Sequence, residues 1–279
     1  MAAAVGLPAA RGGPGRPGRR HERAGRVRGA RAAAPAATAA ALAVVAAVHL
    51  GALLAGATTA VHITKPALMP LLAAYVLARG GPRLLVVGLL FGCGGDTLLQ
   101  TGREALFLVG MGSFAVGHVC YLVLFARHGA AFTRHGAGAA RTYRLTAAYA
   151  AVWVSVLALL WAGLEADLRV PVALYSLLLT VMALGATRVG PWAAAGGVLF
   201  LLSDTLIAGG LAGWPQAPAP QFWIMLTYIA AQYLVAHGLL THLRTGEEQT
   251  KGAGRKPPGP FAARRGRQSW TADRASTMP

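Results

Sequence analysis

The chain has 279 residues, of which 55% are hydrophobic and 13% are charged, and its mean hydropathy is +0.51. These values are too apolar for an ordinary soluble domain of this length and indicate an integral membrane protein. Its 26 Lys and Arg residues outnumber 9 Asp and Glu residues, and the basic residues lie between and beyond the long apolar runs.

Both ends of the chain are basic and rich in Gly, Pro and Ala. Eight arginines lie in residues 1–35 and eight Lys or Arg residues lie in 244–279. Neither segment has helical or strand periodicity, so both are predicted to be disordered tails flanking a membrane domain at 36–243. Contact with anionic lipid headgroups is the favoured explanation of their charge, and we expect no nucleic-acid partner.

Eight apolar runs have about the 20 residues that a membrane-crossing helix needs. The predicted fold class is therefore all-α, a polytopic bundle of about eight transmembrane helices. The first run could also be a signal peptide, because Ala55-Gly56-Ala57 resembles a cleavage site, but the runs that follow favour an anchored first span. The predicted spans are Thr38 to Thr58, Lys65 to Ala78, Leu84 to Gln100, Ala105 to Ala126, Leu145 to Leu164, Val170 to Thr187, Pro191 to Leu211 and Phe222 to Leu240.

The connecting segments indicate the orientation of the spans, since cytoplasmic loops retain Lys and Arg. With the N-terminus inside, the inner segments carry 8, 2, 4, 1 and 8 basic residues and the outer segments carry 3. The outer segments also hold Glu104, Glu165 and Asp167. We therefore expect both termini to be cytoplasmic, and the Ala-, Gly- and Arg-rich composition favours a bacterial plasma membrane.

Asp96 and Asp204 are the acidic residues within the apolar spans, in the third and seventh spans. Each lies about 12 residues from the cytoplasmic start of its helix, or ~18 Å into the bilayer at ~1.5 Å per residue. A carboxyl group at that depth must face the bundle interior and find a partner or hold a proton. The two could serve only as interhelical hydrogen-bonding groups, but their matching depth favours a shared catalytic site. Both begin an Asp-Thr-Leu sequence, which is consistent with a parallel four-plus-four duplication.

Several other polar residues within the spans are candidates for binding substrate. Lys65 precedes Pro66 near the outer boundary, where it could snorkel, hold a phosphate headgroup or act on an aspartate. His118 and Tyr121 are three residues apart and share a helix face. Tyr228 and Gln232 are four residues apart and also share a face. For each pair the alternative is a role in packing or in interhelical hydrogen bonding. Tyr175 in the sixth span is a weaker candidate.

Metal and disulfide sites are not indicated. Four histidines spread over different segments, His49, His62, His118 and His237, lack HxxxH or HExxH spacing, so no metal or other cofactor is expected. Cys93 and Cys120 lie in apolar runs, where they are expected to pack as small hydrophobic residues. Gly92-Cys93-Gly94-Gly95 is not a phosphate loop, and its glycines are expected to permit close helix packing beside Asp96.

Five short motifs together resemble the YhhN-like lysoplasmalogenase family, over about 200 residues that exclude both tails. In chain order they are Lys65-Pro66, Gly95-Asp96-Thr97-Leu98-Leu99, Gly117-His118-x-x-Tyr121, Ser203-Asp204 and Tyr228-x-x-x-Gln232. The resemblance implies hydrolysis of the sn-1 vinyl ether bond of a lysoplasmalogen, giving a fatty aldehyde and a glycerophospho-base.

That reaction requires a proton donor and a nearby anion, because protonation of the alkene creates an oxocarbenium ion that water captures. Paired carboxyl groups supply both in glycosidases. On this hypothesis one of Asp96 and Asp204 is the acid and the other the anion or base, while Lys65 holds the phosphate and His118, Tyr121 and Gln232 orient water or headgroup. The alternatives are a proton- or ion-coupled transporter that uses the aspartates as a relay, a structural protein, and a metal-dependent lipid hydrolase.

Overall fold

The computed structural model describes residues 18–129 and 136–253, and within them it contains eight α-helices and no strand. Each helix is long and apolar enough to cross a membrane. The predicted all-α polytopic bundle is therefore confirmed. The helices are α1 (Gly18–Leu54), α2 (Thr58–Ala78), α3 (Arg83–Gln100), α4 (Glu104–His128), α5 (Gly136–Trp161), α6 (Ala166–Ala186), α7 (Pro191–Leu211) and α8 (Pro220–Ala253).

The helix ends differ most from the predicted ends in the two basic segments. α1 begins at Gly18 and α8 continues to Ala253, so helix extends into both segments for which disorder was predicted. Alanine and the straight-chain residues Glu, Gln and Leu have high helix propensity, which sustains a helix beyond the apolar run. Residues 1–17 and 254–279 of the predicted tails lie outside the described residues.

Besides α1, two spans begin seven or more residues earlier than predicted. α2 begins at Thr58 instead of Lys65, and α5 begins at Gly136 instead of Leu145. Hydropathy marks where a helix becomes apolar, whereas backbone hydrogen bonding begins in the polar residues before that point. Lys65 therefore lies two turns inside α2 and not at its start.

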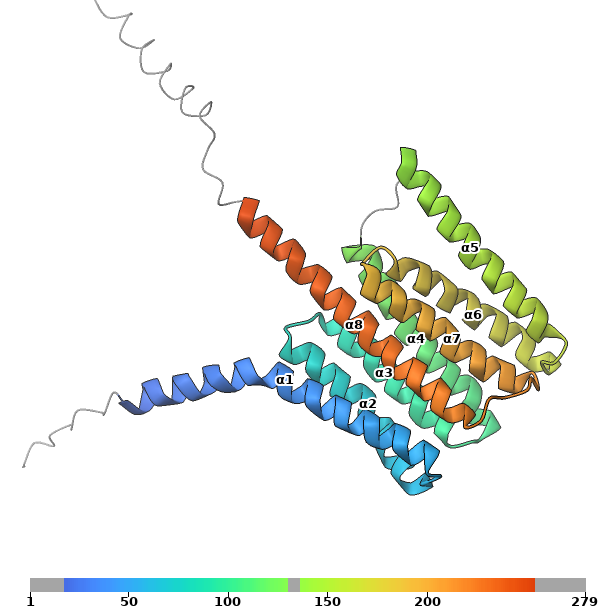
Figure 1. Ribbon diagram of the computed structural model, residues 1–279, viewed down its shortest axis with the longest axis horizontal. Helices are drawn as coiled ribbons and strands as arrows, with labels where there is room; N and C mark the ends of the chain where they lie inside the picture. The colour runs from blue at the N-terminus through green and yellow to red at the C-terminus, as the bar shows by residue number, and fades with distance from the viewer. Residues whose placement is uncertain (1–17, 130–135, 254–279) are drawn as a thin grey trace, which may run out of the picture.

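Seven of these helices form a closed ring in which each packs on the next, in the order α1, α2, α3, α4, α6, α7, α8 and back to α1. α5 lies outside the ring, where it packs mainly on α6, and Figure 1 shows it at the periphery of the bundle. The buried core fills the ring, with large side chains such as Tyr121, Phe125, Phe200 and Met182 fully enclosed.

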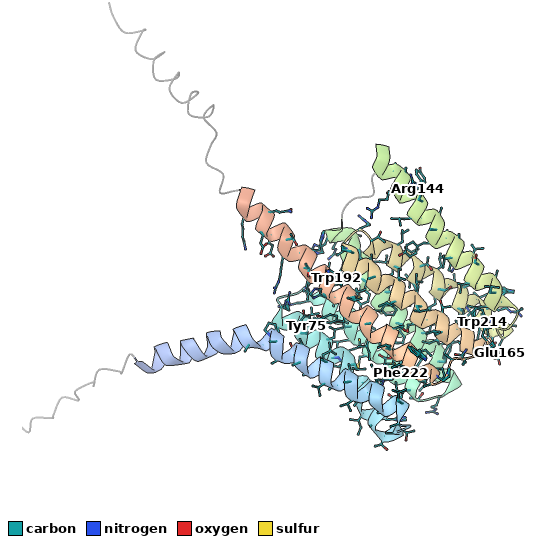
Figure 2. All side chains as sticks on the ribbon, viewed as in Figure 1. Tyr75, Arg144, Glu165, Trp192, Trp214 and Phe222 are labelled. Atoms are coloured by element: carbon teal, nitrogen blue, oxygen red, sulfur yellow. The ribbon has the colours of Figure 1, made fainter. Side chains whose placement is uncertain are left out.

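The two ends of the bundle differ. The extensions of α1 and α8 project from one end, on which Tyr75 and Trp192 lie, whereas Glu165, Trp214 and Phe222 mark the opposite end in Figure 2. α4 and α6 approach each other toward the first end, where Gly185 packs on Phe125. Toward the second end lies a cavity whose wall includes residues of both α4 and α6.

Candidate functional site

A cavity of about 290 Å³ lies in the half of the bundle away from the helical extensions. Asp96 of α3 and Asp204 of α7 both line it, together with Lys65 of α2, Tyr175 of α6 and Tyr228 of α8. Residues of five different helices thus meet at one polar wall, although up to 163 positions of the sequence separate them. The remaining wall is mainly apolar and includes one face of α5.

Asp96 is paired with the amine of Lys65. The Lys65 Nζ lies 3.7 Å from the Asp96 Oδ1, and the side chains are 15% and 5% exposed. Asp96 Oδ2 has no hydrogen-bond partner among the described residues. An ammonium group this close stabilises the negative charge of a buried carboxylate. The unpaired oxygen leaves Asp96 able to accept a hydrogen bond from water or a ligand.

The flanking residues of Lys65 are each held by a neighbouring helix. Thr64 Oγ1 lies 2.8 Å from Nδ1 of the fully buried His49 in α1, and the Cys93 thiol of α3 donates to the Pro66 carbonyl at 3.3 Å. The Thr64 hydroxyl already donates its single hydrogen to the Ala60 carbonyl at 2.7 Å. While the Thr64 hydroxyl donates to Ala60, the bond between Thr64 and His49 requires a hydrogen on His49 Nδ1.

Asp204 belongs to a chain of hydrogen bonds with Tyr175 and His118. The Tyr175 hydroxyl donates to Asp204 Oδ2 at 2.7 Å and lies 3.1 Å from His118 Nε2. Since a tyrosine hydroxyl has one hydrogen, it donates to one neighbour while it accepts from the other. When Asp204 accepts, His118 carries its hydrogen on Nε2; when Asp204 is protonated, Tyr175 can turn its hydrogen toward His118.

A second polar chain crosses the centre of the helix ring. The Tyr121 hydroxyl donates to Gln232 Oε1 at 2.7 Å, and Gln232 Nε2 donates to the Tyr228 hydroxyl at 3.3 Å. Phe200 packs edge-on against both His118, at a ring distance of 4.8 Å, and Tyr228, at 5.5 Å. This arrangement fixes the ring of Tyr228, which lines the same cavity as Asp96.

The glycines before Asp96 permit this close approach. A Cβ atom at Gly92 would lie 3.1 Å from the Tyr228 hydroxyl, and one at Gly95 would lie 2.5 Å from the ring of Phe114. The expectation of close helix packing beside Asp96 therefore agrees with the structure.

The structure places the eight predicted site residues in two layers. The layer that lines the cavity comprises Lys65, Asp96, Tyr175, Asp204 and Tyr228. His118, Tyr121 and Gln232 lie behind it, almost fully buried in the ring. Their hydrogen bonds run to Tyr175 and Tyr228, so they are placed to hold cavity residues and not to touch a ligand.

Sequence reasoning missed the contacts that orient this wall. His49 and Cys93 were considered only as a possible metal ligand and a packing residue, yet both support the segment that carries Lys65. Trp153 of α5, which donates to Ser176 Oγ at 3.0 Å, was not considered. A buried histidine in an apolar run is itself a signal of a polar partner, but the partner is not identifiable before the helices are paired. Among the described residues, no group of three or more His, Cys, Asp or Glu side chains is placed to hold a metal.

Comparison of the sequence with known proteins identifies a matching family. The model of the YhhN family matches residues 60–239. A protein of Mycobacterium bovis (strain ATCC BAA-935 / AF2122/97) named lysoplasmalogenase is 32% identical over 166 residues, and so is a protein of the same name from Mycobacterium tuberculosis (strain CDC 1551 / Oshkosh). Each comparison covers 56% of this chain and 60% of the relative's length. No solved structure matches the chain significantly.

Proposed function

The chain belongs to the YhhN family, and from this premise we propose that it is a membrane hydrolase that cleaves the sn-1 vinyl ether bond of lysoplasmalogens. The observation that carries the proposal is that Asp96 and Asp204, from separate helices, line one cavity. The names of the two mycobacterial relatives support the same reaction class.

The different partners of the two carboxyl groups suggest different roles. Asp96 lies beside a cation, Lys65, which favours its charged form. Asp204 has a neutral partner, the Tyr175 hydroxyl, and lines the same cavity as Asp96. Two carboxyl groups in one apolar site are most stable with one proton between them. We therefore assign Asp204 as the acid and Asp96 as the anion.

In the proposed reaction, Asp204 transfers its proton to the outer alkene carbon, which leaves an oxocarbenium ion. Asp96 stabilises this cation and accepts a proton from the water molecule that adds to it. The resulting hemiacetal breaks its bond to the glycerol oxygen, giving the aldehyde and the alcohol. The proton held by Asp96 replaces the one lost from Asp204, so the cycle consumes one vinyl ether and one water.

The residues around the carboxyl groups would orient the reactants. Tyr175 holds Asp204, and His118 holds Tyr175, so the proton-donating carboxyl is fixed in direction. Tyr121 and Gln232 hold Tyr228 at the other side of the same wall. Lys65 lines the cavity as well as pairing with Asp96, and its amine is the cation placed to attract a phosphate group there.

A fatty-aldehyde assay tests the reaction class. Purified protein in detergent is given a defined lysoplasmalogen and, separately, the saturated ether lysolipid of the same headgroup and chain. We expect aldehyde from the vinyl ether alone, because only an alkene can be protonated to an oxocarbenium ion. Absence of aldehyde from both lipids, with folded protein, would contradict the proposal.

Replacement of each aspartate by asparagine tests the assigned roles. Asp96→Asn and Asp204→Asn should each lower the rate of aldehyde release by at least about 10²–10⁴-fold, the range for loss of a general acid or base. The control is Asp167→Asn, which changes an exposed carboxyl group in the first turn of α6. Thermal unfolding of all three proteins should match the unchanged protein; full activity in both cavity variants would contradict the mechanism.

A further inference from the structure

The cavity wall has a polar side, with Lys65, both aspartates, Tyr175 and Tyr228, and an apolar side to which α5 contributes one face. The α5 residues that line the cavity recur at spacings of three and four, which place them on one helix face, and they are Tyr149, Val152, Trp153, Val156, Leu157 and Leu160. Apart from the Tyr149 hydroxyl and the Trp153 indole nitrogen, this face is hydrocarbon.

α5 has little contact with the rest of the protein outside this face. It packs mainly on α6, and the side chains of Val154 and Leu159 are 55% and 67% exposed on its outer face. In a bilayer that outer face contacts lipid. α5 is therefore a single-helix wall between the cavity and the surrounding hydrocarbon.

The cavity reaches the lipid-facing surface beside Val152. This residue lines the cavity and is nevertheless 56% exposed. On the next residue, the Trp153 indole donates to Ser176 of α6, which fixes the helix next to this opening. A hydrocarbon chain could thus pass from the bilayer to the apolar side of the cavity without crossing the polar side.

We propose that the α5 face is the binding subsite for the single hydrocarbon chain of the substrate, with Val156 and Leu157 contacting the chain beyond the reacting bond. The inference rests on the proposed function and adds where the chain lies. With a volume of about 290 Å³, the cavity lies just below the range of ordinary ligand pockets, ~300–1,000 Å³.

This subsite acts through position more than through affinity. A chain that moves from lipid into an apolar pocket leaves one hydrocarbon environment for another, so it gains little hydrophobic free energy. The α5 wall instead fixes the position of the hydrocarbon chain, and this places the vinyl ether bond next to the two carboxyl groups. An obstruction in the path should therefore displace long chains and leave short ones in place.

Leu157→Trp tests the subsite, and Leu159→Trp is its matched control. Both make the same change on α5, but Leu157 lines the cavity and Leu159 faces lipid. Two quantities are measured for each variant: binding of saturated octyl-ether and hexadecyl-ether lysophospholipids, which cannot be cleaved, and kcat/KM for vinyl ethers of the same two lengths. We expect Leu157→Trp to weaken hexadecyl binding and cleavage by about tenfold, or about 1.4 kcal/mol, relative to octyl. Leu159→Trp should leave both unchanged.

Equal losses for octyl and hexadecyl lipids, or equal losses in both variants, would overturn the subsite. If Leu157→Trp does not fold, Val156→Phe places a smaller obstruction on the same face and the same comparison applies. The outcomes separate the two proposals. If the unchanged protein cleaves neither lipid but Leu157→Trp weakens hexadecyl binding selectively, the proposed hydrolase is contradicted and the subsite is supported. If the unchanged protein cleaves the vinyl ether but Leu157→Trp has no chain-length-selective effect, the hydrolase is supported and the subsite is contradicted.

Discussion

Lys65 is held beside Asp96 by contacts that its own side chain does not make. His49 of α1 holds the Thr64 side chain, and Cys93 of α3 holds the Pro66 carbonyl, so the two residues that flank Lys65 are each tied to a different neighbouring helix. Pro66 has no N–H group, which weakens the helix locally and makes such support valuable. His49 is accordingly a positioning residue that acts through Lys65.

Substitution of His49 should lower activity only while Lys65 is present. We expect His49→Leu, which cannot donate to Thr64, to lower kcat by about tenfold through loss of one buried hydrogen bond, typically ~1–3 kcal/mol. His49→Asn, whose amide can replace the Nδ1 hydrogen, should restore most of the rate. Aldehyde release is the measurement.

The decisive comparison is made in a Lys65→Met background. There His49→Leu should cause no additional loss, because a residue that acts through Lys65 has nothing left to position. Additive losses in the double variant would show instead that His49 merely stabilises the fold.

The sequence allowed prediction of the cavity residues and of His118, Tyr121 and Gln232 behind them, but not of the residues that support Lys65. Asp96 and Asp204 were identifiable because a charge inside an apolar run is costly wherever the helices pack, so its position alone implies a role. The role of His49 depends on Thr64 as its partner, and that pairing arises only when α1 and α2 lie side by side. Tyr175 lines the cavity and Tyr121 does not. This difference also could not be predicted, because it depends on how α4 and α6 are rotated about their axes.

At the scale of helices, α3 and α4 cross at a contact between glycines. A Cβ atom at Gly117 of α4 would lie 2.9 Å from the Gly88 carbonyl oxygen of α3, a backbone atom that cannot rotate away. The next residue along α4 is His118, which holds Tyr175. The distance between α3 and α4 therefore also sets the position of the hydrogen-bonded series His118, Tyr175 and Asp204.

Gly117→Ala should separate α3 from α4, whereas Gly112→Ala on the same helix should not. No atom lies within 4 Å of a Cβ at Gly112. Alanine gains roughly 0.5–1 kcal/mol over glycine within a helix, and overpacking at Gly117 costs about 1–3 kcal/mol. We expect Gly117→Ala to lower both the unfolding temperature in detergent and aldehyde release, and Gly112→Ala to leave them equal or higher. A stable, active Gly117→Ala protein would contradict the close crossing.

Helix number and order followed directly from the hydropathy of the sequence, since each span is a local property of about 20 residues. The position of α5 outside the ring did not. Its composition resembles that of the other spans, and only the packing shows that it covers a cavity formed by the others. For the same reason the sequence predicted a catalytic pair but gave no location for the hydrocarbon chain.

For the whole molecule, the position of the cavity relative to the chain ends indicates which leaflet would supply the proposed lipid substrate. The extensions of α1 and α8 project from one end of the bundle, and the cavity lies toward the other, with Leu211 and Gln221 at its margin on either side of the α7–α8 connection (Figure 1). The distribution of Lys and Arg favours cytoplasmic termini. On this orientation, which we propose, the polar wall lies in the outer half of the membrane.

Cysteines introduced one at a time at the two ends of the bundle, in addition to Cys93 of α3 and Cys120 of α4, test this orientation. Glu165 is exposed at the cavity end and Arg144 is exposed on α5 at the other end, and Figure 2 labels both. In intact bacterial cells, a membrane-impermeant thiol reagent should modify Glu165→Cys and should reach Arg144→Cys only after lysis. Intact cells should then also cleave lysoplasmalogen supplied from outside, because the substrate enters the leaflet onto which the cavity opens. Labelling of Arg144→Cys before lysis would invert the assignment, and the carboxyl pair would have to take its substrate from the cytoplasmic leaflet.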